Sequence, residues 1–459
     1  MNDPGSIPDE SAGRGRSLLD RLGSVPFSRW HMKSRIIMGS ATFFDAFDAL
    51  SLAFVLPVLK DLWSLSPGQI GMLISSGYIG QFLGALAFGS LAERLGRVRS
   101  ASLAVALMSV MGLICILSGR YEVLLVCRFI QGIGVGGEVP VAAAYINEIS
   151  PAQARGRFFM LYEMIFPIGL MVTGQVGAWL VPSAGWQSMF LVGGIPGIII
   201  AIFIARLPES PRWLIGRGRL DEAERVIENL EASTPERLSA TPPPAPVPPL
   251  TPASTQTGWR ELFSRTYRHR TMVVWGLWFC TYLVANGLNN WLPTLYKTVY
   301  HLDLKTALHA ASMTNVLQVI ATLACALLVD RWGRRNWASA CYVGAGVLFA
   351  LLAWLGTDSV VRVGIFATLA YGVLGSTNVL LYLYTPEIYP TRMRAVGTGL
   401  ATAWLRLGSS AGPALVASCV VFGGVSAVFW LFAIVCAIAL VISRFMIETR
   451  QRTLEEIAP

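Results

Sequence analysis

The segment GSLAERLGRVR, residues 89–99, returns in a shorter form as DRWGRR, residues 330–335. In both copies an acidic residue and an arginine precede a glycine and a second arginine, and both copies directly follow a long apolar run. The copies are offset by 237 residues, and Arg155 and Arg392 differ by the same number. Two landmarks with one offset indicate that the chain consists of two related halves.

Apolar runs dominate the chain between these landmarks. Hydrophobic residues make up 54% and charged residues 14% of the sequence, whereas about a quarter of a soluble domain is charged. A membrane-spanning helix needs about 20 apolar residues, and twelve runs reach that length, near 36–59, 68–92, 100–118, 122–146, 157–181, 186–207, 272–296, 306–329, 338–356, 361–386, 396–420 and 424–447. Because Gly and Pro interrupt them without alternating polarity, we predict helices rather than barrel strands.

Basic residues are unevenly distributed around these runs. If the N-terminus is cytoplasmic, most Lys and Arg residues fall in the inner loops and the two tails. The exceptions are Lys60, Arg120, Lys297, Lys305 and Arg362 in outer loops, and Arg128 and Arg406 within spans. This asymmetry predicts that both termini are cytoplasmic. It also accounts for the net charge of +9 without a nucleic-acid partner.

The longest polar stretch divides the spans six and six. The predicted parts are an N-terminal tail 1–35, a six-helix half 36–207, a cytoplasmic loop 208–271, a second six-helix half 272–447 and a cytoplasmic tail 448–459. In the loop, residues 221–236 predict an amphipathic helix, and the proline-rich residues 242–252 are typical of an extended linker. The linker is either a plain tether or a docking site for a partner.

Several of these motifs resemble those of the major facilitator superfamily. The acid-Arg-x-Gly-Arg loop after the second and eighth spans resembles the signature of that superfamily. Residues 128–138 (RFIQGIGVGGE), residues 208–214 (PESPRWL) and Glu448-Thr449 resemble its sugar-porter-like branches. The resemblance implies an all-α major facilitator fold, in which two pseudo-symmetric six-helix halves rock around a site near the middle of the lipid bilayer.

The charged loop residues are candidates for gates. At helix ends they can pair across the inner seam between the halves in one state and separate in the other, and the alternative is that they only anchor the inner face. The candidate gating residues are Glu93, Arg94, Arg97, Glu148, Arg155, Asp330, Arg331, Arg334, Glu387 and Arg392. For Glu148, we expect Arg155 as the partner.

Six ionisable residues lie within the predicted spans: Asp45, Asp48, Arg128, Glu138, Glu163 and Arg406. Each charge would cost about 2.5–3.5 kcal/mol at the centre of a helix on insertion scales. The six must therefore face the bundle interior or a wet cavity. Intramembrane charges of this kind mark substrate and proton pathways.

Asp45 and Asp48 are three residues apart on the first span, which places them on one helical side. Two carboxylates that close do not easily ionise together in a medium of low dielectric constant, so we expect one of them to carry a transported proton. The alternative is a structural ion pair with an arginine. The segment FDAFD, residues 44–48, resembles the first-helix motifs of aromatic-acid/proton symporters and of nicotinate-type transporters.

Arg406 lies in the middle of the eleventh predicted span. A guanidinium is not neutralised by deprotonation, so its presence there favours an anionic ligand, although an acidic residue across the bundle is an alternative partner. Related organic-anion carriers tend to have Arg at the matching position of their eleventh helix. This resemblance favours a carboxylate substrate.

The other polar residues of the spans give less specific predictions. Arg128 is a candidate for substrate binding or for pairing with Asp45 or Asp48, and Glu138 and Glu163 are candidates for a proton relay or for structural hydrogen bonds. Candidates for lining a substrate cavity are Tyr78, Gln81, Gln131, Asn286, Asn290, Trp291, Asn315, Asn378 and Tyr382, with helix packing as the alternative.

The sequence predicts a secondary transporter rather than an enzyme. We expect proton-coupled uptake of a small organic anion, such as an aromatic or heterocyclic monocarboxylate, with a sugar or polyol symporter as the alternative and a drug/proton antiporter as a weaker one. The seven cysteines lie in apolar runs without paired spacing, so we expect no metal site, and no cofactor beyond a proton gradient. Short outer loops favour a bacterial inner membrane, and we expect the protein to be a monomer.

Overall fold

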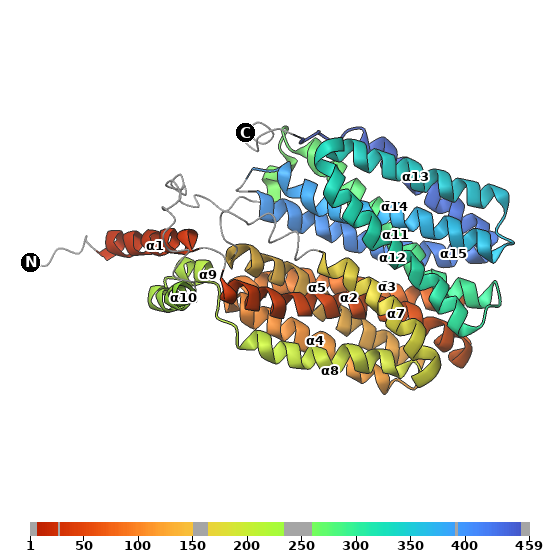
Figure 1. Ribbon diagram of the computed structural model, residues 1–459, viewed down its shortest axis with the longest axis horizontal. Helices are drawn as coiled ribbons and strands as arrows, with labels where there is room; N and C mark the ends of the chain where they lie inside the picture. The colour runs from red at the N-terminus through yellow and green to blue at the C-terminus, as the bar shows by residue number, and fades with distance from the viewer. Residues whose placement is uncertain (1–6, 26–27, 150–163, 234–258, 391–392, 451–459) are drawn as a thin grey trace, which may run out of the picture.

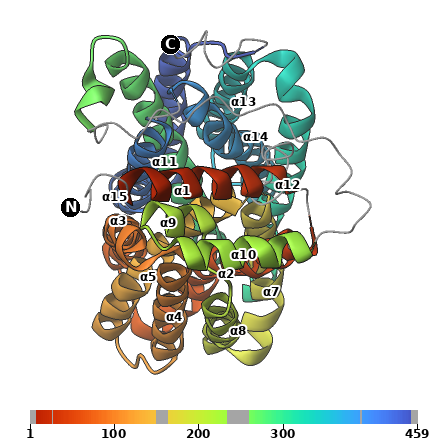
Figure 2. The ribbon, with the colours of Figure 1, turned by 90° about the vertical axis from the view of Figure 1, so that its left-hand side faces the viewer.

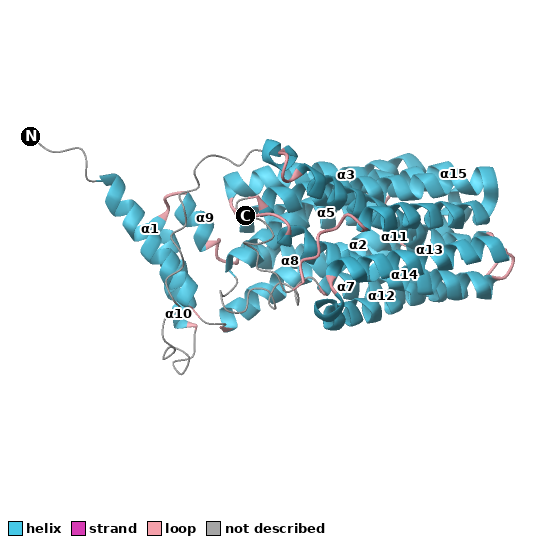
Figure 3. Ribbon diagram, turned by 90° about the horizontal axis from the view of Figure 1, so that it is seen from above, coloured by secondary structure: helices cyan, strands magenta, loops and turns pink. Residues whose placement is uncertain are grey.

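The structure is a computed structural model that describes residues 7–25, 28–149, 164–233, 259–390 and 393–450. All regular elements in these ranges are helices (Figure 3). The long ones are α2 (Arg29–Trp63), α3 (Pro67–Leu95), α4 (Arg97–Ile116), α5 (Tyr121–Ile149), α7 (Ile165–Ala184), α8 (Gln187–Ala205), α11 (Arg268–Thr298), α12 (Leu304–Trp332), α13 (Arg334–Leu355), α14 (Val360–Glu387) and α15 (Arg394–Ser443).

Eleven helices of the described ranges are long and apolar enough to cross a membrane. One of them, α15, contains both of the last two predicted spans and is interrupted at Gly424, where φ is 67° and ψ is −164°. A residue with a side chain rarely adopts this backbone conformation, so a glycine is required where α15 is interrupted. Counting α15 twice gives the twelve crossings that the apolar runs predict, and the predicted all-α membrane fold is confirmed.

The helices form two groups of six crossings. In Figure 1, α2, α3, α4, α5, α7 and α8 lie in the lower group, whereas α11 to α15 lie in the upper group. We call these groups the first half and the second half. The end of the bundle that carries α1, α9 and α10 is called the near end, and the opposite end is called the far end (Figures 1 and 2).

The short helices form a small layer over the near end. They are α1 (Ile7–Ser24), α9 (Pro211–Gly216) and α10 (Leu220–Ala232), whereas the 3-10 turn η3 (Trp259–Phe263) packs against α11 and α15. Of these, α10 matches the predicted amphipathic helix, while the proline-rich linker lies outside the described residues. The sequence analysis missed α1, which packs Leu18 and Leu22 beside Ile227 of α10. Arg14 adds an ion pair with Asp221 at 2.7 Å.

Candidate functional site

A cavity of about 100 Å³ lies between the two halves. Because one molecule of liquid water occupies about 30 Å³, the cavity has room for a few waters or for a small organic molecule. Helices α2, α3, α5 and α7 contribute to its wall from the first half, and α11, α12, α14 and α15 contribute from the second. The polar lining residues are Thr42, Asp45, Tyr78, Gln81, Tyr282, Asn286, Asn289, Gln318, Tyr371, Asn378, Tyr382, Arg406 and Ser409.

Arg406 brings a positive charge into this wall from the second half. Its side chain is 5% exposed, and Nη1 and Nη2 donate to the carbonyl oxygens of Thr402 at 3.1 Å and Gly136 at 3.3 Å. Its Nε atom is buried without a hydrogen-bond partner among the described residues, and no described carboxylate forms an ion pair with it. A buried guanidinium that no described carboxylate contacts directly leaves room for an anion at this position.

Asp45 is the acidic group of the cavity wall. Its Oδ1 atom is buried without a hydrogen-bond partner in the described ranges, and its charge interacts electrostatically with those of Arg406 and Glu138. Thr42, one turn earlier on α2, donates to Glu138 Oε1 at 2.9 Å. Helices from both halves therefore bring two acids and one arginine together around the same space.

Asp48 belongs to a different environment, away from the cavity wall. Its carboxylate is 1% exposed and interacts electrostatically with Arg128 of α5. Arg128 Nη1 donates to Gln131 Oε1 at 2.7 Å and to the Asp48 backbone carbonyl at 3.4 Å. On the α8 side, a Cβ atom added to Gly193 would lie 2.5 Å from Asp48 Oδ1, so the carboxylate fills the space that the glycine leaves.

A chain of hydrogen bonds joins the halves along another part of the wall. Tyr78 of the first half donates to Asn286 Oδ1 at 3.0 Å, and Asn286 Nδ2 donates to Ser409 Oγ at 2.7 Å. Asn290 lies behind this chain and donates to the Tyr78 hydroxyl at 3.1 Å. The amide and phenol groups of this part of the wall are therefore already engaged with one another.

Seven of the predicted residues line the cavity: Asp45, Tyr78, Gln81, Asn286, Asn378, Tyr382 and Arg406. Predictions for the others need correction, because their side chains bond elsewhere. Gln131 and Asn290 support Arg128 and Tyr78, as described above. Trp291 Nε1 donates to the carbonyl of Pro413 at 3.1 Å, and Asn315 pairs with the Asn289 amide at 3.2 Å. Arg128, Asp48 and Glu138 also lie off the wall, and Glu163 lies outside the described residues.

The lining residues that sequence reasoning missed include Thr42, Asn289, Gln318 and Ser409. Each is three residues from a residue that was singled out: Asp45, Asn286, Asn315 and Arg406, respectively. Residues three apart share one side of a helix. Extending each candidate by one turn would have found all four.

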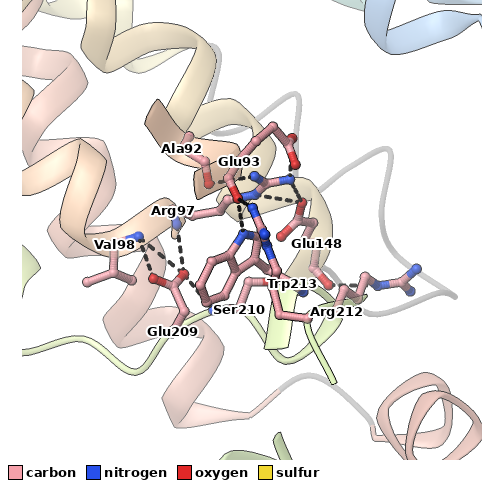
Figure 4. A network of polar contacts seen from close by, with 10 residues as sticks. Ala92, Glu93, Arg97, Val98, Glu148, Glu209, Ser210, Arg212 and Trp213 are labelled. Carbon is pink, nitrogen blue, oxygen red and sulfur yellow. Dashed lines mark hydrogen bonds and ion pairs between the residues drawn. The ribbon is translucent and has the colours of Figure 1, made fainter. Parts of the chain in front are cut away.

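A network of polar contacts lies at the near end of the first half (Figure 4). Arg97 Nη2 pairs with Glu148 at 2.9 Å and with Glu93 at 3.0 Å. The Glu209 carboxylate accepts from the backbone N–H groups of Arg97 at 2.9 Å and Val98 at 3.2 Å, the first residues of α4. Burial raises the pKa of Glu209, and these backbone donors oppose that shift. The carboxylate thus caps α4 at its positive end.

The second half repeats this arrangement. Arg334 pairs with Asp330 at 2.8 Å and with Glu387 at 3.1 Å, and Glu448 accepts from the backbone N–H of Arg334 at 2.9 Å. Gly96 and Gly333 are required before the two caps, because both have positive φ and a Cβ atom there would collide with Glu209 or Glu448, respectively. The PESPRWL segment and the Glu448-Thr449 pair are therefore two copies of one structural device.

In this structure the gate residues pair within each half, and pairing across the seam in another state stays a prediction. The described ion pairs of Arg97 and Arg334 lie within one half each, not across the seam, and Glu148 pairs with Arg97. Arg94 and Arg331 are exposed. Arg155 and Arg392 lie outside the described residues, so the expected Glu148–Arg155 pair stays a prediction.

Contacts between the halves occur instead towards the far end. Ser75 Oγ donates to the carbonyl of Ser410 at 2.7 Å, and Gln175 Nε2 donates to Ser312 Oγ at 3.0 Å. Lys297, at the end of α11, forms an ion pair with Asp61 at the end of α2. These three contacts hold the halves together on the far side of the cavity, in addition to the hydrogen bonds in the cavity wall.

The amino-acid sequence of this chain is similar to the sequences of known membrane transporters. Residues 40–459 match the family model described as sugar (and other) transporter. The chain is 33% identical over 443 residues to the niacin transporter NiaP of Acinetobacter baylyi, covering 96% of this chain and 99% of that protein. It is 27% identical to the 4-hydroxybenzoate transporter PcaK of the same organism, covering 85% of each.

Solved structures agree on the fold. The xylose transporter XylE from E. coli, in a partially occluded inward-open conformation, superposes with a TM-score of 0.73 at 17% identity, covering 93% of this chain and all of that one. A D-xylose-proton symporter gives a TM-score of 0.69 at 19% identity, covering 92% of this chain and 99% of that one. At these identities the likeness concerns the architecture of the two halves.

Proposed function

Since the chain belongs to the sugar (and other) transporter family of the major facilitator superfamily, and is a membrane transporter rather than an enzyme, we propose that it takes up a small organic anion together with protons. The substrate class is an aromatic or heterocyclic monocarboxylate. The names of the two relatives, a niacin transporter and a 4-hydroxybenzoate transporter, support this class.

The observation that carries the proposal is the buried Arg406 guanidinium in the cavity wall. It has no described carboxylate as an ion-pair partner, and one of its donors is unused. A carboxylate would complete it with charge-assisted hydrogen bonds, which are stronger than those between neutral groups. Gln81 also lines the cavity and can donate from its amide to the same carboxylate. A neutral sugar would leave the Arg406 guanidinium without a carboxylate in direct contact.

Protons enter the proposed cycle at Asp45. While ionised, this carboxylate competes with the substrate for the positive potential of Arg406. Protonation of Asp45 removes the competing charge, so the substrate carboxylate binds in its place and the loaded site carries no excess charge into the closed state. Release of substrate and proton on the other side restores the Asp45–Arg406 attraction. Glu138, which accepts a hydrogen bond from Thr42, is a candidate for relaying this proton.

We place the near end on the cytoplasmic side of a bacterial inner membrane, because the basic loops at residues 94–99 and 331–335 lie there. The proposed carrier acts as a monomer with the proton gradient as its energy source and no other cofactor. Rocking of the halves exposes the cavity alternately to the two sides.

The sugar or polyol symporter remains the second candidate. Its support is the set of amide groups in the wall of the second half, Asn286, Asn289, Gln318 and Asn378, because amides suit the paired donor and acceptor character of sugar hydroxyls. Arg406 separates the two candidates, since a hydroxyl needs no cation.

Uptake by proteoliposomes that contain the purified protein tests the proposal. We expect a pH that is lower outside the vesicles than inside to drive accumulation of labelled nicotinate or 4-hydroxybenzoate. Arg406→Gln should reduce this accumulation at least about a hundredfold, because the substrate carboxylate loses its hydrogen-bonded ion pair with a buried group. Ser418→Ala, on the same helix but with an exposed side chain that bonds only within α15, is the matched control. Transport of a neutral sugar that survives Arg406→Gln, together with no uptake of either acid, would favour the second candidate.

A further inference from the structure

We propose that Asn378 selects among organic acids by hydrogen bonding to a polar ring atom that lies across an aromatic ring from the carboxylate. The preferred substrates are then ring acids with a hydroxyl group or a ring nitrogen, such as hydroxybenzoates and pyridine carboxylates, over unsubstituted benzoates. This inference rests on the proposed function and specifies its substrate class.

Among the amides that the second half contributes to the cavity wall, Asn378 differs in having no described hydrogen-bond partner for its Oδ1 atom. Its Oδ1 atom is buried and has no hydrogen-bond partner among the described residues. By contrast, Asn286 is bonded to Tyr78 and Ser409, Asn289 to Asn315, and Gln318 Oε1 accepts from Tyr371 at 3.2 Å. An unpaired buried amide is costly to retain, and one that borders the cavity has a natural partner in the cargo.

Helix geometry relates Asn378 to Arg406 through Tyr382 of α14. Tyr382, which interacts electrostatically with Arg406, lies four residues after Asn378 on the same side of α14. At a rise of 1.5 Å per residue the two side chains are separated by about 6 Å along the helix. A six-membered ring with its carboxylate on Arg406 extends over about that distance, so its opposite edge reaches the level of Asn378.

Aromatic side chains line the same cavity as these two polar groups. Tyr282, Tyr382 and Phe166 line the same cavity, and Tyr382 is held by an edge contact with Trp278 at 4.7 Å between ring centroids. Aromatic rings pack favourably edge to face or offset. The wall thus offers a cation, aromatic rings and an amide within one cavity.

The chemistry of an amide explains why both kinds of polar ring acid qualify. The asparagine side chain presents an acceptor and donors on adjacent atoms, so it accepts from a phenolic hydroxyl or donates to a ring nitrogen. Benzoate has neither group, and its ring would exclude water from the amide and leave it unpaired. We therefore expect benzoate to bind about tenfold more weakly than the polar ring acids.

Calorimetric titration of the purified full-length protein in lipid nanodiscs tests this inference, with nicotinate, 4-hydroxybenzoate and benzoate as probes. In the unmodified protein at least one of the two polar ring acids should bind about tenfold more tightly than benzoate. Asn378→Leu should abolish that preference, because it removes the amide that the polar ring acids bind and that benzoate leaves unpaired. Asn378→Ala serves as a second variant, since it adds no bulk.

Thr377→Val is the matched control, because Thr377 is buried, bonds to the carbonyl of Leu374 within α14 and does not line the cavity. It should keep the tenfold preference. Equal affinities for the three acids in the unmodified protein, or a preference that survives in both Asn378 variants, would overturn the inference while leaving carboxylate transport intact. Loss of benzoate binding in both variants would overturn it too, since Asn378 would then shape the whole cavity. Failure of all three acids to bind the unmodified protein would overturn the proposed function itself.

Discussion

Asp45 and Asp48 lie one helical turn apart on α2, yet they belong to different regions of the molecule. Asp45 lines the cavity between the halves and interacts with Arg406 of α15. Asp48 is enclosed within the first half, where Arg128 of α5 lies beside it and Gly193 of α8 leaves room for its carboxylate. One acid–base pair therefore joins the two halves, and the other is internal to one half.

This difference separates the parts that change in transport from the parts that do not. When the halves rock, the distance between Asp45 and Arg406 must change, because they are attached to different rigid bodies. Asp48 and Arg128 move together. The pair between the halves is therefore suited to link protonation to substrate binding, and the internal pair is suited to hold α2 against α5 and α8.

The largest expected effect concerns the internal pair. Asp48→Leu should lower the free energy of unfolding by about 3–5 kcal/mol, because it leaves the buried Arg128 charge without its counter-charge. Thermal and denaturant unfolding of the purified protein in detergent measures this change. Asp48→Leu combined with Arg128→Leu should recover most of the loss. If the two single effects simply add in the double variant, the two side chains do not act as a pair.

A smaller effect is expected from the glycine that borders the same carboxylate. Gly193→Ala places a Cβ atom where only 2.5 Å separates it from Asp48 Oδ1, and overpacking of this kind costs about 1–3 kcal/mol. Gly399→Ala is the matched control, because no atom lies within 4 Å of its added Cβ atom. The unfolding temperatures of the two variants are compared in the same detergent. Equal shifts would mean that Asp48 is not enclosed by α8.

The fold was predictable because its signals are local. Twelve apolar runs of sufficient length determine twelve crossings, and the repeated loop at 89–99 and 330–335 identifies the two halves. The structure adds that these loops are held by Glu209 and Glu448, which come from the ends of the sixth and twelfth spans. Such pairing between distant segments leaves no periodic signal. For the same reason α1, whose apolar side packs on α10, was missed.

The candidate site was only partly predictable. Transfer energies decide that charged groups such as Asp45, Asp48, Arg128 and Arg406 avoid lipid, but not which cavity or partner each one faces. At 3.6 residues per turn, residues three apart differ by about 60° around the helix axis. That rotation is enough to turn Asp45 to the seam and Asp48 into the first half. Polar residues such as Trp291 are equally ambiguous, because a bond to a neighbouring backbone satisfies them as well as a ligand does.

The smallest expected change in stability, and the sharpest test of the comparison, comes from Asp45. Asp45→Asn should alter the free energy of unfolding by less than about 1 kcal/mol, because the amide has the same shape, Oδ1 loses no hydrogen bond, and the lost attraction to Arg406 is offset by the lost repulsion from Glu138. Its effect on transport should be large. Because the variant has no carboxyl group here to bind and release a proton, the acid gradient no longer drives accumulation of nicotinate in proteoliposomes, while exchange of labelled for unlabelled nicotinate continues.

Asp48→Asn, the same substitution one turn away, should destabilise the protein more and keep its coupling to the gradient. If Asp48→Asn uncouples transport and Asp45→Asn does not, the proton is carried by the internal pair and the roles proposed for the two regions are reversed.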